Sequence, residues 1–203
     1  MPDRGKVYVI DDDEAMRDSL NFLLDSANYK VTLFETALKF LDALPSLEFG
    51  CVVSDVRMPG LDGIELLKRM KAGHSTFPIV IMTGHGDVPL AVKAMKLGAT
   101  DFVEKPFDGD ALVKVLIAAL MPESSVSAKD AISGELLSRL ASLSQRESQV
   151  LKGLVNGQTN KEIAREFDLS PRTVEVYRAK LMTKMQAGSI SELVRFAIKA
   201  GAY

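Results

Sequence analysis

Short apolar runs alternate with segments of helical periodicity throughout the first 120 residues, and this alternation restricts the chain to few folds. The apolar runs are VYVI (7–10), KVTLF (30–34), CVVSD (51–55), PIVIMT (78–83) and TDFVE (100–104). Between them, apolar residues recur at spacings of three and four, as Leu20, Leu23 and Leu24 do. Such alternation is typical of a doubly wound parallel sheet, whose strands are buried on both faces. We predict an α/β domain over residues 5–120, with a five-stranded parallel sheet in a (βα)5 arrangement.

Chemically reactive side chains stand where these predicted strands end. They are Asp11 and Asp12 at the end of the first strand, Asp55 at the end of the third, Thr83 at the end of the fourth and Lys105 directly after the fifth. Ligands of open parallel sheets bind outside the carboxyl ends of the strands, so we expect all five at one edge. Clustered carboxylates repel one another, which predicts a bound hard cation such as Mg²⁺. The carboxylate of Asp55 could then accept a phosphoryl group, with Lys105 and Thr83 on its oxygens.

Two further acidic residues, Asp13 and Glu14, follow directly in the same run. They lie past the predicted strand end and at the start of a helical pattern. Carboxylates at a helix N-terminus interact favourably with the helix dipole, so we interpret both as helix-start residues rather than metal ligands.

The second part of the chain has a different composition. Residues 121–137, MPESSVSAKDAISGELL, have the composition of an interdomain linker, part of which could be helical. Residues 138–203 show only helical patterns and carry 11 Lys and Arg against 6 Asp and Glu, although the net charge of the whole chain is −2. We predict a small all-α domain over 138–203, whose positive balance permits nucleic-acid binding.

Within this domain, TNKEIAREFDLSPRTVEVYRAKLMTKM predicts a helix, a short turn and a second helix. Ser170 is a suitable N-cap and Pro171 fits the first helical position. One face of the second helix is apolar: Val174, Tyr177, Leu181 and Met185. The opposite face carries Arg172, Glu175, Val176, Ala179, Lys180 and Thr183. Small, polar and basic residues suit entry into a DNA major groove, and a merely solvated face would have the same composition.

The motifs IDDDE, SDVRMPGLDG, IVIMTGHG and DFVEKPF together resemble the receiver domain of two-component response regulators. The resemblance implies that Asp55 is the phosphoacceptor. It implies Mg²⁺, or Mn²⁺, bound by Asp11, Asp12, Asp55 and the backbone carbonyl of Arg57. It also implies a cis peptide bond between Lys105 and Pro106.

The same resemblance assigns roles to residues around the phosphoacceptor. Thr83 and Lys105 would bind the phosphoryl group. Phe102 is either a core aromatic or a switch residue that moves with Thr83. Arg57 and His85 would border the path of the hydrolytic water and so tune the lifetime of the phosphoryl group.

The segment LSQRESQVLKGLVNGQTNKEIAREFDLSPRTVEVYRAKLMTKM resembles the four-helix, LuxR-type helix-turn-helix domain. The candidate DNA contacts are Asn160, Lys161, Arg172, Thr173, Glu175, Val176, Ala179 and Lys180. Glu175 and Tyr177 depart from the pattern, since many members have Lys and His there. These departures put the base preference in question, although Glu175 could accept a hydrogen bond from a cytosine amino group.

A receiver joined to a LuxR-type domain resembles the NarL/FixJ class of response regulators. This resemblance implies a transcriptional activator that is phosphorylated by a sensor histidine kinase and forms a homodimer on promoter DNA, where it acts on RNA polymerase. Within the class, the sequence most resembles regulators of nitrogen fixation, whose kinase is an oxygen-sensing haem protein. The chain would not be an enzyme beyond slow autodephosphorylation.

Other functions remain open at this point. The pocket could belong to an aspartate-based phosphatase with a helical appendage, to a DNA-binding protein with an idle receiver, or to a regulator of another pathway. The polar start of the chain, MPDRGK, and the lack of an apolar run of about 20 residues predict a cytoplasmic protein. The lone cysteine, Cys51, lies in an apolar run and is expected in the core.

Overall fold

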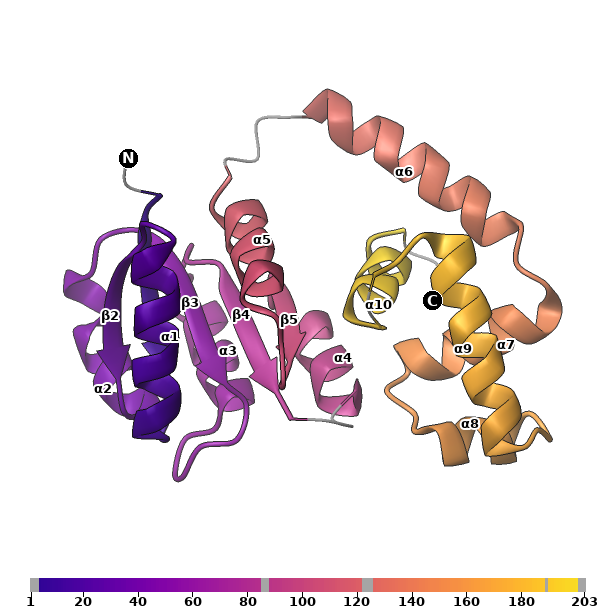
Figure 1. Ribbon diagram of the computed structural model, residues 1–203, viewed down its shortest axis with the longest axis horizontal. Helices are drawn as coiled ribbons and strands as arrows, with labels where there is room; N and C mark the ends of the chain where they lie inside the picture. Colours follow the sequence, from indigo (N-terminus) through magenta and orange to yellow (C-terminus); the bar gives the residue numbers. More distant parts are fainter. Residues whose placement is uncertain (1–3, 85–87, 122–125, 189, 201–203) are drawn as a thin grey trace. The chain divides into compact units, whose positions relative to one another are not determined.

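The computed structural model describes residues 4–84, 88–121, 126–188 and 190–200. By its internal contacts the chain divides into two compact units, one of residues 1–85 and 97–121 and the other of residues 86–96 and 122–203. In Figure 1 the sheet and its flanking helices run from indigo to magenta, and the C-terminal helices are orange to yellow.

A five-stranded parallel sheet forms the centre of the first unit. Its strands are β1 (Lys6–Ile10), β2 (Lys30–Phe34), β3 (Gly50–Asp55), β4 (Ile79–Thr83) and β5 (Asp101–Glu104). They lie in the order β2-β1-β3-β4-β5, and all neighbours are parallel. The predicted α/β architecture is confirmed. The chain leaves β1 toward one edge and returns to β3 on the other side of β1, so β1 and β3 flank the switch point where such sheets bind ligands.

Helices cover the two faces of this sheet. On one face, Leu20 and Leu24 of α1 (Glu14–Ser26) and Leu112 and Leu116 of α5 (Gly109–Leu120) form a core with alternate strand residues such as Val9. Tyr8 points to the opposite face and packs with its ring centroid 6.1 Å from that of Phe40 in α2 (Ala37–Ala43). The short 3₁₀ helix η1 (Leu44–Ser46) follows α2, and α3 (Gly63–Ala72) lies beside α2. Figure 1 shows α1 in front of the sheet and α2 and α3 behind it.

The second unit is helical. Its helices are α4 (Val88–Lys96), α6 (Val126–Ala141), α7 (Gln145–Val155), α8 (Asn160–Glu166), α9 (Pro171–Met185) and α10 (Ile190–Lys199). Residues 126–137, which were predicted as part of the linker, belong to α6. Leu136 anchors this helix, because it is 6% exposed in the core of this unit. The predicted all-α domain is confirmed.

The starts of α7, α8 and α9 follow from side-chain caps. Ser144 and Glu147 form a capping box at α7, and Thr159 and Glu162 form one at α8. Ser170 accepts the backbone N–H of Thr173 at 3.0 Å, and proline stands at the first helical position of α9. The predicted N-cap at Ser170 is therefore confirmed.

Helices α7 and α8 approach closely at Gly153, which is buried. A Cβ placed there would lie 2.6 Å from Cγ1 of Ile163 and 2.8 Å from Oε1 of Gln158. Alanine would favour the helix by about 1 kcal/mol, but overpacking of a core costs about 1–3 kcal/mol. We therefore expect Gly153→Ala to lower the free energy of unfolding by about 1 kcal/mol in chemical denaturation. A Gly153→Ala variant more stable than the wild type would show that α7 and α8 can move apart to accept the methyl group without loss of stability.

Two remaining expectations concern the whole chain. The thiol of Cys51 is 0% exposed, and burial raises its pKa to about 12, so it is the core cysteine predicted. In the part of the chain that the structure describes, no helix combines the length and apolar character needed to cross a membrane.

Candidate functional site

The loop after β1 begins the candidate site. Asp11 is 2% exposed, whereas the side chain of Asp12 is exposed to solvent. Asp13 is the N-cap of α1, since its Oδ1 accepts the backbone N–H of Ala15 at 2.9 Å. Glu14 stands in the first turn of the helix. The interpretation of Asp13 and Glu14 as helix-start residues is confirmed.

Asp55 ends β3, beside the end of β1. Its side chain is largely buried, and its Oδ2 accepts the backbone N–H of Arg57 at 3.0 Å. The turn that follows Asp55 packs tightly against α3, because a Cβ at Gly63 would lie 2.3 Å from the carbonyl oxygen of Asp55. Glycine at this position therefore lets the first turn of α3 support the backbone of Asp55.

Lys105 connects the two acidic strand ends. Its Nζ donates to Asp55 Oδ1 at 2.7 Å and to Asp11 Oδ2 at 2.9 Å, although 50 and 94 residues separate the partners along the chain. The peptide bond to Pro106 is cis, as the resemblance implied. One ammonium group thus holds two carboxylates at the carboxyl end of the sheet, and the predicted convergence of Asp11, Asp55 and Lys105 is confirmed.

Burial and charge oppose each other in this group. Burial raises the pKa of Asp55, and the negative charge of Asp11 adds to that effect, while the Lys105 ammonium opposes it. For Lys105, burial acts to lower the pKa, but the hydrogen bonds and charges of Asp55 and Asp11 outweigh it and raise the pKa. Lys105 therefore stays charged, and its ammonium opposes the repulsion between the two acids.

The other predicted switch residues lie on the neighbouring strands. Thr83 is 1% exposed at the end of β4, and its carbonyl oxygen accepts the backbone N–H of Lys105 at 2.7 Å. Phe102 lies in β5 opposite Ile81 and is 3% exposed, so its ring is in the core. Arg57 is exposed beside Asp55. His85 lies outside the described residues.

The donor set fits a small divalent cation. In the described ranges, no three His, Cys, Asp or Glu side chains come together as a metal site. Mg²⁺, however, is commonly held by one or two carboxylates, with waters and phosphate oxygens completing the shell. Asp11 and Asp55 already converge on one cation, the Lys105 ammonium, and the exposed Asp12 is the next residue in the chain after Asp11. Asp12 and the Arg57 carbonyl as ligands stay predictions.

The sequence argument did not include Arg17, which contacts the same loop. Its Nη1 donates to the carbonyl oxygens of Asp11 at 2.8 Å and of Asp12 at 3.0 Å. One sequence feature could have identified Arg17: it is a basic residue one turn after the start of a helix whose first residues are acidic.

Helices α8 and α9 form the predicted helix-turn-helix. Val174, Leu181 and Met185 are fully buried and Tyr177 packs against the same core, so the predicted apolar face is confirmed. The opposite face is exposed at Arg172, Glu175, Val176, Ala179 and Lys180. Thr173 is half-buried, and its hydroxyl lies 2.8 Å from that of Ser170 at the start of α9.

Two of the predicted DNA contacts lie at the start of α8. Lys161 is exposed. Asn160 Oδ1 accepts a hydrogen bond from Arg178 Nη1 at 2.8 Å, which ties the start of α8 to α9. The structure thus places the candidate DNA contacts on two adjoining helices, and their role stays a prediction.

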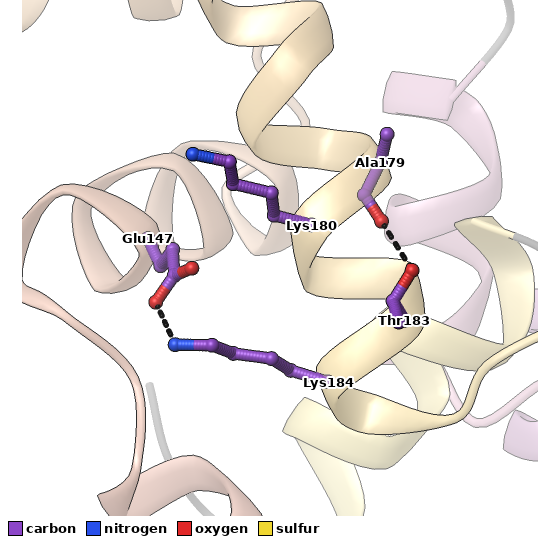
Figure 2. A pocket seen from close by; sticks show the side chains of 5 residues that line it. All are labelled: Glu147, Ala179, Lys180, Thr183 and Lys184. Carbon is purple, nitrogen blue, oxygen red and sulfur yellow. Dashed lines mark hydrogen bonds and ion pairs between the residues drawn. The ribbon is translucent and has the colours of Figure 1, made fainter.

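A pocket of about 540 Å³ lies between α7 and α9, lined by Glu147, Ala179, Lys180, Thr183 and Lys184. Figure 2 shows Glu147 reaching from α7 toward Lys184 on α9. Their closest atoms, Glu147 Oε2 and Lys184 Nζ, are 2.7 Å apart. This ion pair fixes the end of α9 against the start of α7 and was not predicted, because it depends on how the two helices pack.

Comparison with known proteins identifies both units. Residues 7–117 match the response regulator receiver domain, and residues 141–197 match the bacterial regulatory proteins of the luxR family. The transcriptional regulatory protein FixJ of Bradyrhizobium diazoefficiens is 66% identical over 201 residues, covering 99% of this chain and 98% of its own. FixJ of Azorhizobium caulinodans is 54% identical, covering 99% of this chain and 95% of its own.

Solved structures give the same result. The crystal structure of full-length FixJ from B. japonicum matches with a TM-score of 0.59 and 65% identity, covering 100% of both chains. The likeness therefore extends over the sheet, the joining segment and the helix-turn-helix. The protein belongs to the NarL/FixJ class of two-component response regulators, with an N-terminal receiver and a C-terminal LuxR-type domain.

Proposed function

We propose that the chain is phosphorylated on Asp55 by a cognate sensor histidine kinase and that this modification controls its binding to promoter DNA. The observation that carries the proposal is the Lys105 ammonium, which lies 2.7 Å from Asp55 and 2.9 Å from Asp11. A cation held on a largely buried carboxylate prepares this position for a group with negative oxygens.

The chemistry is a phosphoryl transfer from a phosphohistidine. An oxygen of Asp55 bonds to phosphorus as the P–N bond breaks, and the ring nitrogen keeps the electron pair of that bond. Mg²⁺, held by Asp11, Asp12, Asp55 and the Arg57 carbonyl, would neutralise charge on the transferred oxygens. Lys105 would exchange its bonds to the acids for one phosphoryl oxygen, and the Thr83 hydroxyl would donate to another.

The effect of phosphorylation on DNA binding would be exerted through the second unit. The phosphoryl group adds about two negative charges at the sheet edge, and repacking around Thr83 and Phe102 would change the relative stability of two states by a few kcal/mol. Phosphorylation would relieve inhibition by the receiver and favour a homodimer, in which two copies of α9 read half-sites about one helical turn apart. On this proposal the chain is cytoplasmic, acts with RNA polymerase and controls nitrogen-fixation genes through an oxygen-sensing haem kinase.

Intact-mass spectrometry tests the receiver part. With Mg²⁺ and a small phosphodonor such as acetyl phosphate, the wild-type chain should gain the mass of one phosphoryl group. The Asp55→Asn variant should not gain it. Equal labelling of both proteins would place the phosphoryl group elsewhere and refute the assignment.

Selection of binding sites from random-sequence DNA tests whether phosphorylation controls DNA binding. Phosphorylated wild-type chain should enrich a two-fold symmetric site and bind it at least about tenfold more tightly than unphosphorylated chain. Asp55→Asn should show no change with phosphodonor. Equal enrichment by phosphorylated and unphosphorylated chain would instead support a DNA-binding protein with an idle receiver.

The two helices predict different mutational effects on DNA binding. Lys161→Ala removes an exposed charge at the start of α8. We expect it to weaken binding to all DNA sequences and to lower the slope of log K against log salt concentration by about 1.

Glu175→Gln should change the preferred base at one position of the DNA site, with discrimination between bases altered by about 1–3 kcal/mol. Binding to substituted duplexes at several salt concentrations separates the two, and an unchanged base preference in Glu175→Gln would remove that residue from base recognition.

A further inference from the structure

The guanidinium of Arg17 binds the backbone of the acidic loop. Its Nη1 donates to the carbonyl oxygen of Asp11 at 2.8 Å and to that of Asp12 at 3.0 Å. The side chain is half-buried and reaches back from the second turn of α1 to the residues that precede the helix. A cation near a helix N-terminus gains nothing from the helix dipole, so its position is explained by the loop it holds.

The loop needs such a support because its two acids, Asp11 and Asp12, are followed directly by two more at the start of α1, Asp13 and Glu14. An arginine is charged at every accessible pH, and the two N–H groups of its Nη1 serve two acceptors at once here. Arg17 donates these hydrogen bonds to carbonyl oxygens rather than to the carboxylates of Asp11 and Asp12, and its charge adds to the effect of Lys39 in lowering the pKa of Glu35. A lysine bound directly to the carboxylates would instead compete with an incoming cation.

The carboxylate oxygens around Arg17 have separate roles. Asp11 Oδ1 accepts the backbone N–H of Asp13 at 3.0 Å, and Asp11 Oδ2 accepts Lys105. Asp12 is exposed. Arg17 therefore fixes the main chain from which both acids extend and leaves the Asp12 carboxylate accessible.

We propose that Arg17 is a positioning residue for the divalent cation at this edge. The inference rests on the proposed function, in which Asp11, Asp12 and Asp55 bind Mg²⁺. By fixing the carbonyl groups of Asp11 and Asp12, Arg17 holds their carboxylates in place before the cation arrives. Residues that orient metal ligands typically change metal affinity 10- to 100-fold when they are replaced.

Calorimetric titration of the full-length chain with MgCl₂ tests the inference. We expect Arg17→Ala to raise the Kd for Mg²⁺ about tenfold. For Arg17→Lys we expect a Kd between those of the wild type and Arg17→Ala, because an ammonium retains the charge but is more strongly hydrated and sits on a more flexible side chain. Arg69→Ala is the matched control, since it removes an equal charge from α3, where the exposed Arg69 pairs only with Glu65 at 3.6 Å among the contacts described. Its Kd should equal that of the wild type.

Thermal unfolding in EDTA separates positioning from general stability. Arg17→Ala and Arg69→Ala should unfold within a few degrees of the wild type without metal, and only Arg17→Ala should lose part of the stabilisation that Mg²⁺ gives. If Arg17→Ala does not fold, the Kd of Arg17→Lys decides, and a wild-type value overturns the inference. A wild-type Kd in Arg17→Ala also overturns it, while the proposed function stands. A wild-type chain that shows no saturable Mg²⁺ binding overturns the proposed function together with the role of Arg17.

Discussion

Replacing Lys105 with alanine is expected to slow the phosphorylation of Asp55 by a small phosphodonor about 100-fold. The ammonium is the cation that contacts Asp55, at 2.7 Å, and it is held in place before the reaction by Asp11 at 2.9 Å. A preorganised donor that meets developing negative charge in a largely buried site contributes about 10²–10³ in rate. The rate of mass gain in intact-mass spectrometry measures the effect directly.

The same replacement should not weaken the binding of Mg²⁺. The ammonium engages oxygens of Asp11 and Asp55, so its removal should leave the Kd for Mg²⁺ unchanged or lower, while phosphorylation slows. Lys68→Ala is the control, because Lys68 pairs with Glu65 on α3 and is half-exposed. Phosphorylation of Lys105→Ala at the wild-type rate would show that the ammonium serves only to neutralise the two acids.

Replacing Glu147 with glutamine is expected to destabilise the helix-turn-helix domain by about 3 kcal/mol at neutral pH. The hydrogen bond from Lys184 and those from Ser144 lower the pKa of Glu147 to about 2, from an ordinary value of 4.5, and burial opposes this shift. Each pKa unit corresponds to about 1.4 kcal/mol, and breaking a buried ion pair costs about 3–5 kcal/mol. Half of Lys184 is in solvent, which places the expected loss at the lower end of that range.

The pH dependence of this stabilisation has a definite sign. Because the pKa of Glu147 is lower in the folded chain, its contribution is fully present above about pH 4.5 and is lost as the pH falls toward 2. In Glu147→Gln this acid-dependent part should vanish. Hydrogen–deuterium exchange of α7 and α9 peptides, measured between pH 3.5 and 6, reports the local stability once it is corrected for the intrinsic pH dependence of exchange. An identical acid response in both proteins would assign the effect to another carboxylate.

The architecture and the centre of the site followed from simple rules applied to the sequence. Five apolar runs predicted the strands to within one residue at each end, because strands buried on both faces tolerate few polar residues. The convergence of Asp11, Asp55 and Lys105 followed from the parallel sheet, since the carboxyl ends of all its strands lie at one edge. Caps such as Ser170 were predictable because they act within four residues of the chain.

Contacts between distant side chains were less predictable. Arg17, Lys184 and Arg178 are basic residues on helices, and their partners depend on helix packing and on which rotamer each long side chain adopts. The extent of α6 into the predicted linker was also hidden, because its stabilisation includes burial of Leu136 in the helical unit. Predicting these features requires the three-dimensional packing of the helices, whereas the residues at the strand ends can be predicted from the order of the elements alone.

The buried state of Cys51 makes the chain well suited to site-specific labelling. It is the only cysteine in the sequence, its thiol is 0% exposed, and a pKa of about 12 keeps it protonated at the pH used for maleimide coupling. A cysteine introduced at an exposed position, such as Asp18 on α1 or Lys152 on α7, would therefore be the reactive thiol in the native protein. Pairs of such labels would give inter-probe distances in solution, before and after phosphodonor is added, without first removing the native thiol.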